Sequence, residues 1–178
     1  MAKVITLSRT FPKGNPKVGQ PTYFVEKVWE SLWKYTGFRL QGLETSPLLN
    51  DEVNNYQTHD YTPKKHTIRG GKRWKTGDKA SLRVWSGKPY NSKQIVIAPD
   101  VKLVVKDIEI DFAENEGDLK NIIIDGKFFD VFNSETCATE FPLLCENDGL
   151  SESDFLSWFG NKPFSGQMLI WNNNNLPY

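Results

Sequence analysis

The stretch Lys64-Lys65-His66-Thr67-Ile68-Arg69 leads, through a turn with two glycines, into Trp74-Lys75-Thr76-Gly77-Asp78. It combines a hydroxyl that could act as a nucleophile, two candidate bases and several cations. Apolar and polar residues then alternate over 80–85, which predicts a strand directly after it. We therefore expect this stretch to be a loop that leads into a β-strand and carries the functional residues.

Charge is distributed unevenly along the chain. The protein has 178 residues, with 22 Lys and Arg and 22 Asp and Glu. Residues 61–93 nevertheless contain ten Lys and Arg and a single acidic residue, Asp78, whereas residues 94–178 contain five basic and fifteen acidic residues. A basic segment of this kind indicates an anionic ligand, with nucleic acid or a nucleotide as the first candidates.

Length and composition restrict the class of protein. A chain of this length can bury an adequate hydrophobic core, so we expect residues 1–178 to form a single domain. No apolar run reaches the ~18 residues of a membrane span, and the first residues do not resemble a signal peptide. We expect a cytoplasmic protein that does not contact a membrane.

Cysteine and histidine are too few for a structural metal site. Cys137 and Cys145 lie in an expected helix, where eight residues span about 12 Å, beyond the reach of a disulfide. We expect both to be buried thiols. Because His59 and His66 are the only histidines, we expect no metal and no other cofactor.

Hydrophobic periodicity predicts the helices and strands. Apolar residues recur every three or four positions over 22–34, on one face of a helix. Shorter helices are expected near 135–146 and from Ser151, whose spacing to Asp154 is typical of a capping box. Asp125-Gly126 predicts a tight hairpin. The expected strands are 4–7, 80–85, 94–98, 101–111 and 167–171.

These elements predict an α+β fold, a small β-barrel flanked by a few helices. Residues 36–63 show little periodicity and many Gly, Pro, Asn and Thr. We expect them to be an irregular insertion, and insertions of this length are often functional.

Three residues form a candidate catalytic set. The Thr67 hydroxyl reacts only if a neighbouring group accepts its proton. Lys64 lies three residues earlier among other cations, which lower the pKa of a lysine as a general base requires. Asp148, in a tight loop between the last two helices, could supply a carboxylate to this pair.

Other residues of the same region are candidate ligand contacts. Adjacent side chains of a strand point to opposite faces, so His66 cannot act as the base for Thr67 and is expected to pack or hydrogen-bond outward. The turn at 69–73 could offer backbone N–H groups to phosphate. The full set of expected binding residues is Arg9, Lys65, His66, Arg69, Lys72, Arg73, Trp74 and Lys75.

The order of these motifs resembles that of ASCH domains, which belong to the PUA-like superfamily of small β-barrels. Lys-x-x-Thr-x-Arg at 64–69 precedes Gly77-Asp78 and a strand. Asn147-Asp148-Gly149-Leu150-Ser151 is similar to the helical segment that such domains carry before their last strand. The resemblance covers roughly residues 60–171.

The resemblance implies a cleft that receives RNA or a modified nucleoside. Some members of the family hydrolyse the acetyl amide of N(4)-acetylcytidine with a Lys, a Thr and a Glu. By position these correspond to Lys64, Thr67 and Asp148, with Glu146 as a substitute for the last. Aspartate is one methylene shorter than glutamate, so the third residue departs from the pattern.

Three functions follow from these observations. The first is an RNA- or modified-nucleoside-binding PUA-like domain with a basic cleft around residues 61–93. The second is an amidohydrolase that removes the acyl group from N(4)-acylated cytidine, with Thr67 as nucleophile and Lys64 as base. The third is a protein-interaction module whose basic face meets an acidic partner.

Overall fold

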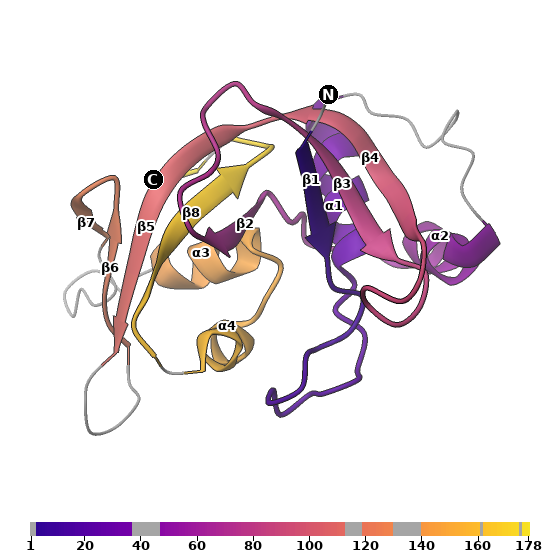
Figure 1. The fold of residues 1–178 in the computed structure, drawn as a ribbon, viewed down its shortest axis with the longest axis horizontal. Coiled ribbons are helices and arrows are strands. Elements are labelled where there is room, and N and C mark those ends of the chain that lie inside the picture. Colours follow the sequence, from indigo (N-terminus) through magenta and orange to yellow (C-terminus); the bar gives the residue numbers. More distant parts are fainter. Residues whose placement is uncertain (1–2, 37–46, 113–118, 130–139, 161, 175) are drawn as a thin grey trace.

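The computed structural model describes residues 3–36, 47–112, 119–129, 140–160, 162–174 and 176–178, which form an α+β fold (Figure 1). The helices are α1 (Phe24–Thr36), α2 (Asn50–Thr58), α3 (Glu140–Asn147) and α4 (Glu152–Phe159), with a 3-10 turn, η1, at Pro47–Leu49. The strands are β1 (Lys3–Leu7), β2 (His66–Gly70), β3 (Lys79–Trp85), β4 (Gln94–Lys102), β5 (Val104–Phe112), β6 (Leu119–Ile124), β7 (Lys127–Phe129) and β8 (Phe164–Ile170).

Within these residues the strands form two sheets. A mixed sheet has the order β1-β3-β4, and an antiparallel sheet has the order β2-β8-β5-β6-β7. Only Leu103 separates β4 from β5, so the chain passes directly from one sheet into the other along the arch seen in Figure 1. The described strands form no single closed barrel, in contrast to the expectation from the sequence.

Helix α1 packs its apolar face on the mixed sheet. Val28 and Trp29 are buried there, and the Trp29 indole Nε1 donates a 2.9 Å hydrogen bond to the carbonyl oxygen of Ile97 in β4. The alternation in β1 buries Ile5 and Leu7 in the same core. The helix expected over 22–34 and the opening strand are therefore confirmed.

In the antiparallel sheet, β8 pairs with the edge strand β2 on one side and with the central strand β5 on the other. The hairpin between β6 and β7 turns at Asp125 and Gly126, both with positive φ (50° and 75°). Two positive φ values in a two-residue turn match the right-handed twist of the strands. The hairpin prediction is confirmed.

The helices α3 and α4 lie beside this sheet (Figure 1). Ser151 caps α4 by accepting a hydrogen bond from the backbone N–H of Asp154, as its spacing predicted. Cys145 of α3 is a buried free thiol, and burial raises its pKa. Residues 130–139, with Cys137, lie outside the described residues.

The expectation of irregular chain over 36–63 is wrong for η1 and α2; residues 37–46 lie outside the described residues. Helix α2 has a weak apolar pattern and is held mainly by its contact with α1. Tyr56 packs edge-on against Trp29 with ring centroids 5.9 Å apart, and its hydroxyl donates to Glu30. Tertiary packing of this kind overrides local propensity.

No described helix combines the length and the apolar character needed to cross a membrane.

Gly166 allows β8 to approach β2 closely. A Cβ on Gly166 would overlap the carbonyl oxygen of Arg69 and lie 2.9 Å from its carbonyl carbon. Overpacking of this kind costs about 1–3 kcal/mol. We expect Gly166→Ala to lower the free energy of unfolding by this amount in urea denaturation.

Gly70, the register partner of Gly166, is the matched control. A Cβ there has its nearest neighbour at 3.9 Å, an ordinary contact. Gly70→Ala should leave stability nearly unchanged, and equal effects of the two variants would contradict the close approach.

Candidate functional site

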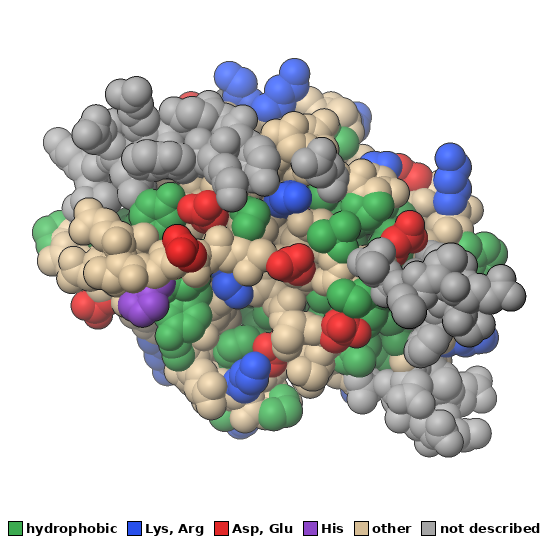
Figure 2. All heavy atoms as spheres, turned by 180° about the vertical axis from the view of Figure 1, so that it is seen from behind, with side chains coloured by type: hydrophobic (Ala, Val, Ile, Leu, Met, Phe, Trp, Pro, Cys, Tyr) green, Lys and Arg blue, Asp and Glu red, His purple; other side chains and the backbone are tan. Residues whose placement is uncertain are grey.

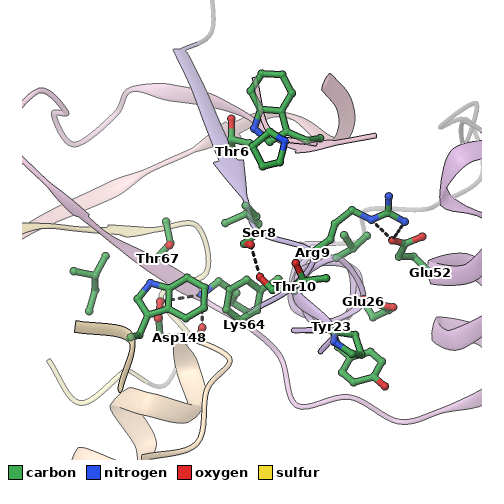
Figure 3. A pocket seen from close by; sticks show the side chains of 18 of the residues that line it. Thr6, Ser8, Arg9, Thr10, Tyr23, Glu26, Glu52, Lys64, Thr67 and Asp148 are labelled. Atoms are coloured by element: carbon green, nitrogen blue, oxygen red, sulfur yellow. Dashed lines mark hydrogen bonds and ion pairs between the residues drawn. The ribbon is translucent and has the colours of Figure 1, made fainter. Parts of the chain in front are cut away.

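Both sheets and three helices line one cavity of about 640 Å³ (Figure 3). Its floor comes from Lys64, from Thr67 and Arg69 of β2, and from Asp148 at the end of α3. Its walls come from β1 and the loop after it, from α1 and α2, and from the hairpin between β3 and β4. Three of these floor residues, Lys64, Thr67 and Asp148, are the set expected to be catalytic.

An ion pair between Lys64 and Asp148 lies at the floor, and both side chains are buried. The Lys64 ammonium donates to Asp148 Oδ1 at 2.9 Å and to the Asp148 carbonyl oxygen. It also lies 4.3 Å from the centre of the Phe24 ring, a cation–π contact. Burial lowers the pKa of Lys64 to about 8, although the Asp148 carboxylate opposes this change.

Burial alone would raise the pKa of Asp148. The positive charge of Lys64 and the nearby His66 ring outweigh burial, so the pKa of Asp148 lies below its ordinary value. The carboxylate is therefore charged at neutral pH.

Two hydrogen bonds fix the backbone of Lys64, which lies just before β2. The Lys64 N–H donates to the carbonyl of Lys27 in α1, and the Trp171 indole donates to the carbonyl of Lys64. Gly149, with φ of 80°, makes the turn between α3 and α4. A Cβ on Gly149 would lie 3.2 Å from Lys64 Cδ, so this glycine supplies both the turn and the space.

His66 lies behind the floor and does not line the cavity. Its Nε2 is 2.7 Å from the Tyr178 hydroxyl and its Nδ1 is 3.4 Å from Asp148 Oδ1. Burial lowers the pKa of His66, which favours the neutral ring. The alternation that separates His66 from Thr67 is confirmed, and His66 packs on the other face of the strand, where it bonds to Tyr178. Its expected place among the ligand contacts is not supported, because the C-terminal residues cover it and it does not line the cavity.

Arg69 follows Thr67 on the same face of β2 and also lines the cavity. Its Nη2 donates a 2.6 Å hydrogen bond to the carbonyl oxygen of Thr6 in β1, which connects the two sheets. Burial lowers its pKa. Glu146, the expected substitute for Asp148, is exposed and does not line the cavity.

The basic segment 61–93 is divided between the interior and several surfaces. Lys65 and Trp74 are buried, not exposed to a ligand as expected. Trp74 is contacted by Lys3 and Arg73, and Gln167 bonds both its backbone N–H and its carbonyl. Lys72 pairs at the surface with Asp107 at 2.9 Å.

The cationic residues expected to bind a ligand therefore separate in the structure. Of that set, Arg9 and Arg69 line the cavity, whereas Lys72, Arg73 and Lys75 are exposed outside it. On the face shown in Figure 2, acidic side chains lie among scattered Lys and Arg.

The cavity also has an acidic wall, which was not expected from the sequence. Glu26 of α1 and Glu52 of α2 are buried there, and Arg9 pairs with Glu52 through its Nε at 2.5 Å (Figure 3). Glu52 Oε2 is buried without a hydrogen-bond partner. Burial raises the pKa of Glu26, and the charge of Glu52 adds to this effect.

The position of Glu26 in the sequence could have indicated a buried carboxylate. It lies beside Val25 on the buried side of a helix, where a carboxylate is unusual. An acid in the first helical turn is also explained by the helix dipole, so its function was not apparent. Glu52 lies in the segment expected to be irregular, which gave no periodicity to place it.

Among the described residues, no group of three or more His, Cys, Asp or Glu side chains is arranged to hold a metal ion. No protein-family model, curated protein or solved structure significantly matches this chain. The resemblance to ASCH domains therefore stays a prediction.

The buried ion pair predicts a pH-dependent stability defect. Asp148→Asn leaves a buried ammonium without its counter-charge, which costs about 3–5 kcal/mol at pH 7. The variant lowers the pKa of folded Lys64 further below about 8, whereas an unfolded lysine titrates near 10.5. The folded variant therefore releases the Lys64 proton at a lower pH than the folded native protein. Its stability rises more steeply with pH just above pH 7, so the defect should shrink between pH 7 and 9.5.

Urea denaturation at both pH values measures this effect, with Asp107→Asn as the control. Asp107 and Lys72 form an exposed pair of the same 2.9 Å length. Exposed pairs add little to stability, so the control should be nearly neutral at both pH values. If Asp148→Asn lowers the free energy of unfolding equally at both pH values, Lys64 does not carry a buried positive charge at pH 7.

Proposed function

We propose that this protein binds RNA or a modified nucleoside, with one base inserted into the cavity. The observation that carries this proposal is a cavity of about 640 Å³ whose floor holds the buried Lys64–Asp148 pair. A cavity of this size is in the ordinary range for small ligands. It is large enough for a nucleoside.

The polarity of the cavity supports insertion of a base. Thr67 and Arg69 offer donors to base carbonyl oxygens, while Glu26 and Glu52 accept hydrogen bonds from amino groups. Nucleobases carry both kinds of group along one edge. The carboxylates repel phosphate, so the sugar-phosphate part is expected at the cavity mouth.

We also infer that the two sheets correspond to the two halves of a PUA-like barrel. The passage from β4 to β5 through Leu103 supports this, because a strand that bends between sheets makes the corner of such a structure. Arg69 adds a hydrogen bond between β2 and β1 at the opposite side of the cavity.

A second candidate is the amidohydrolase of N(4)-acylated cytidine. It is favoured by the pKa of Lys64 near 8, which gives a neutral amine close to physiological pH, and by the place of Thr67 in the same cavity. In this mechanism Thr67 Oγ attacks the acyl carbon and Lys64 takes its proton. Lys64 then protonates the departing cytosine nitrogen, and water hydrolyses the acyl-threonine.

Filling the cavity should abolish ligand binding. Ser8 lines it, and a phenylalanine at this position would occupy the space of the base. Titration calorimetry with N(4)-acetylcytidine and cytidine should show binding to the native protein and none to Ser8→Phe. Ser165→Phe, at an exposed strand position, is the control and should bind normally. Binding to Ser8→Phe with native affinity would place the ligand elsewhere.

The amidohydrolase predicts a pH-dependent release of cytidine that requires Thr67. The rate should rise as the pH passes about 8, since neutral Lys64 is the base. Thr67→Val keeps the size and strand preference of the side chain and should remove turnover while nucleoside binding persists. The release of cytidine is measured by chromatography. If Thr67→Val still releases cytidine, Thr67 is not the nucleophile. No release from the native protein would leave binding as the function.

A further inference from the structure

Two tyrosines that line the cavity have unusual backbone conformations. Tyr23 has φ of 56° and Tyr90 has φ of 64°, both in the left-handed region. Bulky residues rarely adopt it, because Cβ approaches the backbone too closely. Such strain persists where the surrounding structure enforces it, and it gathers at functional sites. Two such residues at one cavity are therefore informative.

Both rings are open to solvent. Tyr90 is 88% exposed and Tyr23 is 39% exposed. Tyr23 directly precedes α1, and Tyr90 lies in the hairpin between β3 and β4, so two distant segments each bring an aromatic ring to the cavity. An exposed ring in strained backbone contributes little to the core. It is positioned to contact something outside the protein.

A second aromatic residue supports each of these rings. Tyr23 and Tyr61 have ring centroids 5.6 Å apart, and Trp85 and Tyr90 have centroids 5.3 Å apart. These contacts restrict the orientation of the exposed rings. Each pair therefore presents the face of an exposed tyrosine ring in a restricted orientation.

The hairpin around Tyr90 is basic, in contrast to the cavity wall. Lys88 and Lys93 lie on either side of Tyr90 and are exposed, and residues 86–93 contain no acidic residue. Cations beside an aromatic ring suit a nucleic-acid strand, whose phosphates meet the cations while a base stacks on the ring. The acidic wall inside the cavity excludes phosphate from the interior.

We propose that the ligand is a nucleotide within a single-stranded nucleic acid, and that its neighbours in the strand stack on Tyr90 and Tyr23. This rests on the proposed function, in which one base enters the cavity. The strand must be single because a base in a duplex already has both faces stacked and its edge paired. A free nucleoside enters the same cavity but brings no neighbouring base to stack on Tyr90.

The test compares a nucleoside with a strand that contains it. The probes are fluorescein-labelled uridine heptamers with N(4)-acetylcytidine, cytidine, adenosine or guanosine at the centre, together with the free nucleosides. At least one heptamer should bind more tightly than its central nucleoside. Tyr90→Asn should lower the affinity for that heptamer about 5- to 150-fold, the effect of one stacked base. Because Tyr90 also lines the cavity, the affinity for the free nucleoside should fall by a smaller factor.

Matched variants separate stacking from folding. Asparagine accepts left-handed backbone, so Tyr90→Asn retains the turn. Tyr90→Phe keeps the ring and should bind the heptamer normally. Phe128→Ala removes an aromatic residue of similar exposure (78%) from β7, which does not line the cavity, and should also bind normally.

The outcomes distinguish this proposal from the proposed function. The proposal of a bound strand would be overturned if a nucleoside binds as tightly as its heptamer, or if Tyr90→Asn changes the affinity for both by the same factor. Either result would leave the nucleoside site intact. Equal affinity for a duplex form would overturn it as well. Absence of binding by every nucleoside and heptamer would overturn both. A DNA heptamer as a further arm shows whether the 2′-hydroxyl is recognised.

Discussion

The buried pair of Lys64 and Asp148 is the interaction on which the cavity depends. Two charges without access to water are stable only when each satisfies the other. Here the pair connects the entry of β2 to the turn between α3 and α4. Gly149 provides the space, and the His66 ring lies 3.4 Å behind the carboxylate. The floor is therefore a rigid polar surface beneath a cavity that both sheets and α1 enclose.

The parts of this arrangement that depend on neighbouring residues could be predicted from the sequence. Thr67 and His66 separate because a strand alternates its faces, and Asp125-Gly126 turns because its two residues accept positive φ. Asp148 could be proposed because a tight loop between two helices presents its carboxylate at a defined position. In the first two cases the physical cause lies within a few residues, whereas the contact of Asp148 with Lys64 spans 84 positions and has no local cause.

The remaining parts arise from contacts between distant segments. The pairing of Arg9 with Glu52 joins residues 43 positions apart, and the contact of His66 with Tyr178 spans 112 positions. Helix α2 is held by Trp29 and Glu30 of α1, not by a strong apolar pattern of its own. Such contacts leave no periodic trace in the chain, so the acidic wall and the interior place of His66 could not be predicted.

The charge count of the basic segment pointed to an anion, but the cavity has a different character. Lys64 and Arg9 are paired with buried carboxylates, and Lys72 is paired with Asp107 at the surface. Within the cavity, positive and negative groups face a ligand together, which favours a molecule with both donors and acceptors. The cations open to phosphate lie outside, where Lys88 and Lys93 flank an exposed tyrosine. A ligand that satisfies both regions has a neutral polar group inside and a charged backbone outside, and a nucleotide in a strand has this division.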